Sequence, residues 1–302
     1  MIYLDSAATT LQKPRAVAAS ARRAVRTLAS PGRGGHPASM RAAEEAFRCR
    51  EAAARLFNVP DPSRVVFTAN ATHGLNIAIK SLARRGARVL VSGYEHNAVT
   101  RPLRAAGADV VFARSELFEP ELAVFAFESR LDARVSLVVC NHMSNVFGYI
   151  LPAERIARLC VERGIPFILD ASQSAGAVEL DFASLGADFV AMPGHKGLYG
   201  PQGTGLLLCA RPCATLYEGG TGSNSLSDLM PDFLPDRLEA GTHNMPGIAG
   251  LRRGIEYVLA RTPRRILERE RALTLFAERE LRATERVRVF GGGFEECRGG
   301  VL

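Results

Sequence analysis

Lysine is scarce in this chain, and one lysine lies in an unusual setting. Of the 38 basic residues only three are lysines, at positions 13, 80 and 196. Lys196 follows the apolar run Phe189–Met192 within Gly194-His195-Lys196-Gly197, whereas Lys80 ends a predicted helix and is expected on the surface. An amine held in a constrained, partly desolvated turn has an accessible neutral form near neutral pH, which Schiff-base chemistry requires.

An acid closes another apolar run. Asp170 ends Pro166–Asp170 and is followed by Ala171-Ser172-Gln173-Ser174. A carboxylate buried at the end of a strand is costly unless it is paired. Asp170 therefore needs a cationic partner, which could be the protonated ring nitrogen of a cofactor, a helix N-terminus or an arginine.

A segment of small residues follows the run Val65–Thr68. It reads Ala69-Asn70-Ala71-Thr72-His73-Gly74 and precedes an apolar helical stretch. Small residues at a helix N-terminus expose free backbone N–H groups, which favour an anion such as phosphate. A plain helix cap by Asn70 or Thr72 explains the same segment equally well.

Two further polar residues follow apolar runs. His96 comes after Arg88–Val91, although a lone histidine is more often structural than catalytic. Asn145 comes after Val135–Cys140. It could hydrogen-bond a ligand or merely shape a turn.

Short apolar runs alternate with helical patterns along most of the chain. This alternation predicts a mostly parallel sheet with helices on both faces. In such sheets ligands bind beyond the carboxyl ends of the strands, so the residues described above are expected at one edge. A phosphate cradle, a buried acid and an enclosed lysine together are the fixtures of a pyridoxal phosphate (PLP) site. The predicted strands are Val65–Thr68, Arg88–Val91, Asp109–Ala113, Val135–Cys140, Pro166–Asp170, Phe189–Met192 and Gly205–Leu208.

The last third of the chain has a different pattern. Residues 218–247 are rich in Gly, Ser, Asp and Pro and predict a long ordered loop, followed by helices over about 247–260 and 264–283. A strand-like Val287–Phe290 follows, and the chain ends within what reads as a new apolar run. We therefore expect a large domain over residues 1–246 and the start of a small C-terminal domain, incomplete, over 247–302.

Composition excludes several classes of protein. The 302 residues are 47% hydrophobic and 23% charged, as in ordinary globular proteins and unlike disordered chains. No apolar stretch approaches the ~20 residues of a membrane helix, and the start of the chain lacks a secretory signal, so a cytoplasmic protein without a membrane partner is expected. The six cysteines include no Cys-x-x-Cys, so no metal site is predicted. Cys49 and Cys160 lie on apolar stripes with helical spacing, which is typical of buried core thiols.

The net charge of +7 comes from scattered arginines. They form no block and are not interleaved with aromatic residues. A solvated arginine-rich surface is favoured over nucleic-acid binding.

Eight stretches of the sequence together resemble the cysteine desulfurase branch of the class V aminotransferase-fold enzymes. No single stretch is specific, but they occur in the family's order over about residues 1–260: Tyr3–Thr10, Asn70–Thr72, Glu95–Asn97, Ser144–Gly148, Asp170–Gln173, Gly194–Gly197, Gly200–Gly203 and Glu239–Thr242. The resemblance implies the PLP-dependent transferase fold of type I, with a mostly parallel seven-stranded sheet. PLP is the cofactor that it implies.

The resemblance also implies roles for individual residues. Lys196 forms the Schiff base with the cofactor and shuttles the substrate's α-proton, and His96 stacks on the pyridine ring and assists proton transfer. Asp170 pairs with the ring nitrogen. The remaining implied contacts are Gln173 with the ring hydroxyl, Asn145 near that hydroxyl and the substrate carboxylate, Ala71, Thr72 and His195 with the phosphate, and Thr242 with the phosphate of a neighbouring subunit in a homodimer.

The sequence departs from the family at three points. Ser6 stands where the family usually has Asn, and Pro193 stands where many relatives have a phosphate-binding Ser. The family's persulfide-forming cysteine and substrate-carboxylate arginine would lie beyond residue 302. Cys297 does not match the motif of that cysteine, and we do not expect it to be the nucleophile.

The expected activity is conversion of L-cysteine to L-alanine with transfer of sulfur as a persulfide, to a sulfur-acceptor protein. The alternatives are another class V PLP enzyme, such as a selenocysteine lyase or an aminotransferase, and a truncated PLP-binding protein without turnover. The sequence supports the α-carbon chemistry better than the sulfur transfer, which needs a thiolate.

Overall fold

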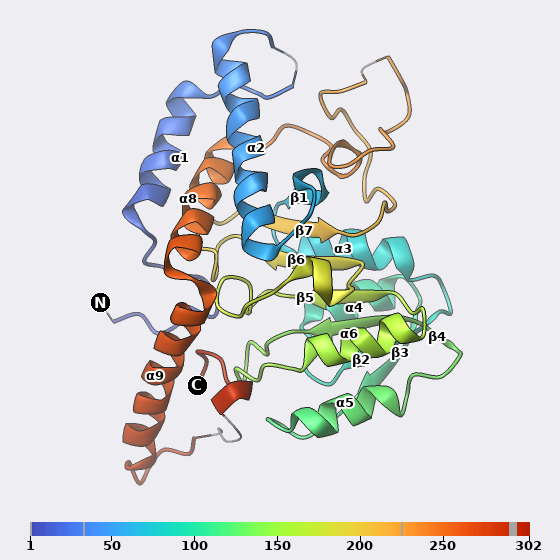
Figure 1. The fold of residues 1–302 in the computed structure, drawn as a ribbon, viewed down its shortest axis with the longest axis vertical. Coiled ribbons are helices and arrows are strands. Elements are labelled where there is room, and N and C mark those ends of the chain that lie inside the picture. Colours follow the sequence, from blue (N-terminus) through green and yellow to red (C-terminus); the bar gives the residue numbers. More distant parts are fainter. Residues whose placement is uncertain (1, 33, 225, 290–294) are drawn as a thin grey trace.

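The computed structural model describes residues 2–32, 34–224, 226–289 and 295–302. Its centre is a seven-stranded sheet with the strand order β1-β7-β6-β5-β4-β2-β3 (Figure 1). Strand β7 is antiparallel to both of its neighbours and the other pairs are parallel, which confirms the predicted mostly parallel sheet. All seven predicted strands are present, with ends shifted by at most one residue: β1 Val65–Thr68, β2 Arg88–Ser92, β3 Asp109–Ala113, β4 Val135–Asn141, β5 Phe167–Asp170, β6 Phe189–Pro193 and β7 Gly205–Cys209.

Helices cover both faces of the sheet, also as predicted (Figure 1). Helices α3 and α4 pack on one face, and α2, α5, α6 and α8 pack on the other. The α-helices are α1 Arg15–Thr27, α2 Pro37–Phe57, α3 Ala71–Leu82, α4 Asn97–Ala105, α5 Pro120–Glu128, α6 Ala153–Glu162, α7 Phe182–Leu185, α8 Met245–Arg261 and α9 Pro263–Arg282.

The central strands are apolar throughout because both of their faces are buried. In β4, Leu137 and Val139 point into the core beneath α3 and α4, while Val138 and Cys140 point into the opposite core. Successive side chains of a strand alternate between its faces, so a strand covered on both sides needs a continuous apolar run. Cys49 and Cys160 are also buried core residues, as predicted.

The C-terminal part agrees with the predictions less closely. Helix α8 begins at Met245 rather than 247 and packs against α1 and α2. Residues 287–289 form no strand, so that prediction is wrong for them, and Phe290 lies outside the described residues. The division into domains at residues 246 and 247 stays a prediction. Both termini lie on the side of the sheet where α9 lies (Figure 1).

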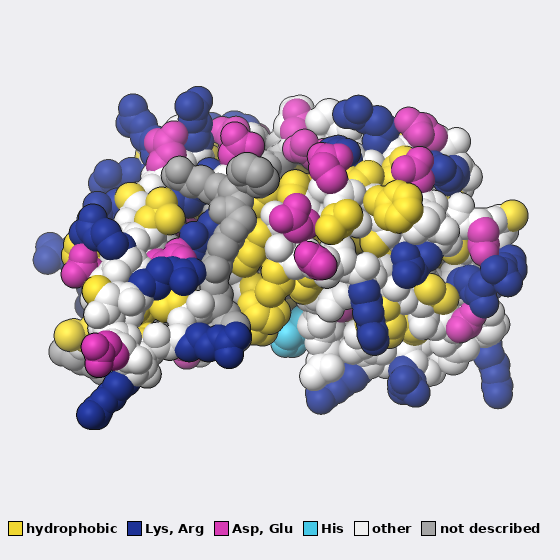
Figure 2. Space-filling model, turned by 90° about the horizontal axis from the view of Figure 1, so that it is seen from below, with side chains coloured by type: hydrophobic (Ala, Val, Ile, Leu, Met, Phe, Trp, Pro, Cys, Tyr) yellow, Lys and Arg dark blue, Asp and Glu magenta, His cyan; other side chains and the backbone are white. Residues whose placement is uncertain are grey.

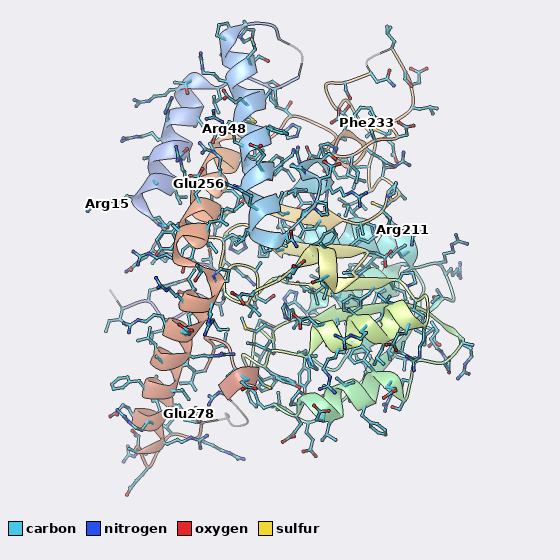
Figure 3. The ribbon with its side chains drawn as sticks, in the orientation of Figure 1. Arg15, Arg48, Arg211, Phe233, Glu256 and Glu278 are labelled. Atoms are coloured by element: carbon cyan, nitrogen blue, oxygen red, sulfur yellow. The ribbon has the colours of Figure 1, made fainter. Side chains whose placement is uncertain are left out.

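Charged side chains are dispersed over the surface. Arg15 on α1, Arg48 on α2 and Arg211 beyond β7 lie far apart in Figure 3. Basic and acidic side chains are mixed over the face seen in Figure 2. Elsewhere on the surface, on α2, Arg48 Nη2 pairs with Glu44 Oε1 at 2.6 Å. This dispersion favours the solvated-surface interpretation of the net charge. Among the described residues, no helix combines the length and apolar character needed to cross a bilayer.

Candidate active site

A cavity lies beyond the carboxyl ends of β4, β5 and β6. We call it the central cavity. Eight of the nine predicted cofactor-binding residues line it: Ala71, Thr72, His96, Asn145, Asp170, Gln173, His195 and Lys196. The ninth, Thr242, lines a different pocket. These eight residues extend over 125 positions of the chain, from Ala71 to Lys196. They converge because the carboxyl ends of the parallel strands meet at one edge of the sheet.

Asp170 is the buried acid at the end of β5. Its Oδ1 accepts hydrogen bonds from the backbone N–H and the hydroxyl of Ser172, and its other oxygen has no hydrogen-bond partner among the described residues. Burial raises the pKa of Asp170, while the Ser172 hydrogen bonds and the charge of Lys196 act in the opposite direction. A carboxylate with one free oxygen facing a cavity is suited to hold a protonated nitrogen.

Lys196 lies in a glycine-rich turn after β6. A Cβ on Gly194 would lie 2.1 Å from Thr204 Oγ1, and a Cβ on Gly197 would lie 2.4 Å from the carbonyl oxygen of Ala175, so both positions need glycine. Burial lowers the pKa of Lys196, and the charge of Asp170 counteracts this. Burial in the turn thus favours the neutral amine that a carbonyl-bonding lysine requires.

The first residues of the chain hold this turn in place. We call residues 3–13 the N-terminal arm. The Thr10 hydroxyl donates to the carbonyl of Lys196 at 2.9 Å, and the Thr10 N–H donates to the carbonyl of His195 at 3.1 Å. Lys13 Nζ also donates to the carbonyl of His195 at 3.3 Å, and Gln173 Nε2 donates to the carbonyl of Ala7 at 2.9 Å. The arm therefore forms one wall beside the lysine.

The N-terminus of α3 opens into the central cavity. Asn70 caps the helix, because its side-chain oxygen accepts the N–H of His73 at 2.9 Å. The backbone N–H groups of Ala71 and Thr72 have no partner among the described residues, as expected for the first turn of a helix. The cap interpretation is therefore confirmed, and the anion interpretation stays a prediction that the free N–H groups of the next two residues are compatible with.

His96 both caps a helix and lines the central cavity. Its Nδ1 accepts the N–H of Ala98 at 3.0 Å and so caps α4. A neutral imidazole that accepts at Nδ1 carries its proton on Nε2. The exposed ring lines the central cavity, so the structural and the ligand-contacting interpretations are compatible.

Glu95 is a buried acid to which the sequence assigned no role. Its Oε1 accepts the N–H of Asn141 at 2.7 Å and the hydroxyl of Ser92, which ties the loop carrying His96 to the end of β4. Burial raises the pKa of Glu95 to about 8, and the nearby charge of Asp170 adds to this. Burial and the charge of Asp170 therefore both favour the protonated form of Glu95.

Comparison with known proteins agrees with this geometry. The family model described as Aminotransferase class-V matches residues 2–302. The chain belongs to this family. It is 34% identical over 271 residues to a "Probable cysteine desulfurase" of Methanothermobacter thermautotrophicus, an alignment that covers 85% of this chain and 66% of the relative. It is 37% identical over 252 residues to "Cysteine desulfurase IscS" of Vibrio vulnificus, covering 76% of this chain and 60% of the relative.

The fold comparison gives the same family. The apo structure of a cysteine desulfurase from Thermococcus onnurineus NA1 superposes with a TM-score of 0.86 at 28% identity, covering 99% of this class V chain and 77% of that one. The type I fold predicted from the sequence is thereby confirmed. The chain thus spans less than two thirds of the length of these curated relatives, 66% of one and 60% of the other.

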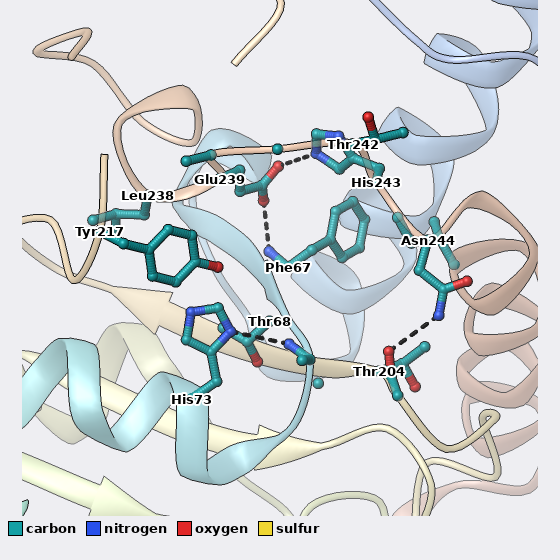
Figure 4. Close-up of a pocket in the computed structure, with 16 residues that line it drawn as sticks. Phe67, Thr68, His73, Thr204, Tyr217, Leu238, Glu239, Thr242, His243 and Asn244 are labelled. Atoms are coloured by element: carbon teal, nitrogen blue, oxygen red, sulfur yellow. Dashed lines mark hydrogen bonds and ion pairs between the residues drawn. The ribbon is translucent and has the colours of Figure 1, made fainter. Parts of the chain in front are cut away.

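Thr242 of this class V chain lies in a second pocket, shown in Figure 4. The centre of that pocket is a buried network around Glu239. Arg50 donates to Glu239 through both guanidinium nitrogens at 2.8 and 2.6 Å, and the N–H of Phe67 and His243 Nε2 each lie 2.6 Å from the same carboxylate. Burial opposes ionisation, yet Arg50 and His243 keep the pKa of Glu239 below its usual value. The contact of Thr242 with a neighbouring subunit stays a prediction.

Removing Arg50 should destabilise the fold strongly. An Arg50→Ala chain would leave the Glu239 carboxylate buried without its main cationic partner, and we expect a loss of about 3 kcal/mol in the free energy of unfolding. Denaturant titration measures this loss. The control is Arg48→Ala, which breaks the exposed pair with Glu44 and should cost less than about 1 kcal/mol. Equal costs for the two variants would contradict the importance of the buried network.

The cysteines of this class V chain lie away from the central cavity. All six thiols are free, five are buried, and none of them lines the central cavity or the cavity beside the N-terminal arm described below. Burial raises the pKa of every one of them, including the half-buried Cys297. Nor do the described residues contain a cluster of three or more His, Cys, Asp or Glu that could hold a metal ion.

Proposed function

We propose that this chain binds PLP in the central cavity and takes part in removing sulfur from L-cysteine to give L-alanine. The observation that supports this most directly is the meeting of Lys196, Asp170 and the N-terminus of α3 in one cavity. The names of the relatives support the choice of reaction.

The residues present fit the chemistry of PLP. The cofactor carries an aldehyde, a basic ring nitrogen and a phosphate, and the cavity offers a desolvated amine, a carboxylate with an unshared oxygen and unpaired backbone N–H groups. When bound, PLP supplies an electron-withdrawing ring that stabilises negative charge at the α-carbon of an amino acid. Pro193 cannot donate the hydrogen bond that a Ser at this position gives in many relatives, so the phosphate would depend on Ala71, Thr72 and His195.

Each remaining residue has a defined task in this proposal. Lys196 anchors the cofactor and moves the substrate's α-proton, and Asp170 keeps the ring nitrogen protonated. His96, with its proton on Nε2, stacks on the ring and assists proton transfer. Gln173 and Asn145 contact the ring hydroxyl, and Asn145 also lies near the substrate carboxylate. Thr242 completes the phosphate site of a second copy, so the active form is a homodimer.

Sulfur transfer requires a further component. A thiolate must attack the substrate sulfur, forming an S–S bond as the C–S bond breaks. All six cysteines of the chain are described and none lines either cavity at the lysine, so we assign this thiolate to a group other than these six, with a sulfur-acceptor protein as the final recipient. The same observation favours, as a second candidate, a class V reaction that needs no protein thiol, such as selenocysteine lysis or amino transfer. The proposed location is the cytoplasm.

Product analysis tests the proposal. The PLP-loaded chain, given L-cysteine and a reducing thiol, should release alanine and sulfide in equal amounts, because each C–S cleavage yields one of each. Chromatography of alanine and a colorimetric sulfide assay measure them, and free PLP with cysteine is the control. Amino transfer to a keto acid without sulfide would replace the desulfurase proposal with the aminotransferase one.

A further inference from the structure

A second cavity adjoins the central cavity at Lys196. We call it the arm cavity because the N-terminal arm forms one of its walls. Its volume is about 300 Å³, and it shares Met143, Gln173 and Lys196 with the central cavity. A molecule that bonds or approaches the Lys196 amine from outside the cofactor position therefore has room here. If PLP fills the central cavity, the arm cavity is where the amino acid would lie.

Glu270 of α9 brings a carboxylate into this cavity. Among the described residues that line it, Lys196 and Glu270 are the side chains that carry a formal charge. The side-chain carboxylate of Glu270 has no hydrogen-bond or ion-pair partner within the described part of the chain, and the burial of this group raises its pKa to about 7. No described group therefore forms an ion pair with this carboxylate, and its burial strengthens its effect on other charges in the cavity.

The backbone at Gly300 lies close to the Glu270 side chain. A Cβ on Gly300 would lie 2.8 Å from both Cβ and Oε2 of Glu270, so the glycine leaves the space that the glutamate occupies. The interaction between Glu270 and Tyr199, which also lines the cavity, raises the pKa of the tyrosine further beyond the effect of burial. Glu270 of α9 thus lies close to Gly300 and lines the same cavity as Lys196 and Val301.

We propose that Glu270 is a specificity-determining residue, which admits amino acids with neutral or cationic side chains to the arm cavity and rejects those with acidic side chains. The inference rests on the proposed function, because it assigns the arm cavity to the amino-acid substrate of a PLP site. Every α-amino acid brings the same ammonium and carboxylate groups, so discrimination falls on the side chain. A second carboxylate in this cavity meets an unpaired like charge, which is disfavoured. The cysteine side chain carries no such group when it is protonated.

A pair of ligands of equal size isolates the effect of charge. L-asparagine and L-aspartate differ only in an amide against a carboxylate, and each can be titrated into the PLP-loaded chain at pH 8 by following the visible absorbance of the cofactor. We expect asparagine to bind at least about tenfold more tightly than aspartate. In Glu270→Gln, which keeps the size of the side chain, this ratio should fall to within about threefold. Glu268→Gln, on the exposed face of the same helix, is the control and should leave the ratio unchanged.

The outcomes separate this inference from the proposed function. Equal binding of the two ligands to the unaltered chain would overturn the inference, whatever the variants do. So would a ratio that Glu270→Gln leaves unchanged, or a loaded chain that responds to neither ligand. A charge-dependent ratio without sulfide release from cysteine would keep the inference and overturn the desulfurase proposal. A chain that takes up no PLP would overturn both.

Discussion

Replacing Lys196 with alanine is expected to abolish covalent attachment of PLP and to reduce alanine formation from cysteine at least about 10³-fold. Lys196 is the lysine of the central cavity, and the proposal gives it both the anchoring of the cofactor and the movement of the α-proton. A positioned acid–base group alone contributes about 10²–10⁴-fold to a rate, so the loss of both tasks should lie within or above this range.

Attachment can be measured separately from turnover. Borohydride reduction of the PLP-loaded chain should fix the cofactor to the peptide that contains Lys196, and mass spectrometry identifies that peptide. Lys80→Ala is the control, because Lys80 is exposed near the end of α3 and should not affect attachment. Lys13 is the other lysine near the site, since it donates to the carbonyl of His195. Cofactor fixed to Lys13 in the unaltered chain would show that the wrong amine has been assigned.

Replacing Asp170 with alanine is expected to lower the rate of alanine formation by about 10²–10⁴-fold. The change leaves the protonated ring nitrogen of the cofactor without its buried partner, and breaking such a pair costs about 3–5 kcal/mol. One decade in rate corresponds to about 1.36 kcal/mol, so the full cost in the transition state gives the stated range. Steady-state kinetics of the loaded enzyme measure it, and near-normal turnover would contradict the assignment.

Asp170→Asn separates the charge of the residue from its shape. The amide oxygen can still accept from Ser172, yet the negative charge is lost, so the rate should fall nearly as far as in Asp170→Ala.

In the cofactor-free chain, Asp170→Asn should affect stability favourably. Burial raises the pKa of Asp170 in the folded state, so above the pKa of the unfolded chain its ionisation opposes folding. Asp170→Asn should therefore raise the stability of the cofactor-free chain at neutral pH, as denaturant titration would show. A less stable cofactor-free variant would contradict this account.

The sequence was sufficient to predict the central cavity because the geometry of parallel strands is simple. Asp170 and Lys196 each follow a buried strand, and the carboxyl ends of such strands meet at one edge. The contact of Glu95 with Asn141 is not predictable in this way, because nothing in the sequence next to His96 shows that Glu95 turns inward. The pairing of Arg50 with Glu239 joins residues 189 positions apart, and no local pattern indicates it.

The errors near the C-terminus also have physical reasons. Pro246 and Gly247 read as loop residues, but the proline occupies the first turn of α8 and the Asn244 side chain accepts the N–H of Gly247 at 3.0 Å. Residues 287–289 alternate in polarity like a strand. A strand also needs a neighbouring strand, and no strand or isolated β-bridge of the described chain includes residues 287–289.

The contact of the N-terminal arm with the Lys196 turn has a consequence for the order of events during synthesis. Thr10 reaches the carbonyl of Lys196 across 186 positions of the chain. The N-terminal arm is synthesised before its partners, so it lacks these contacts until the sixth strand and the turn beyond it have been made. A nascent chain can complete most of its sheet before the arm closes the wall beside Lys196, so this wall forms late in translation.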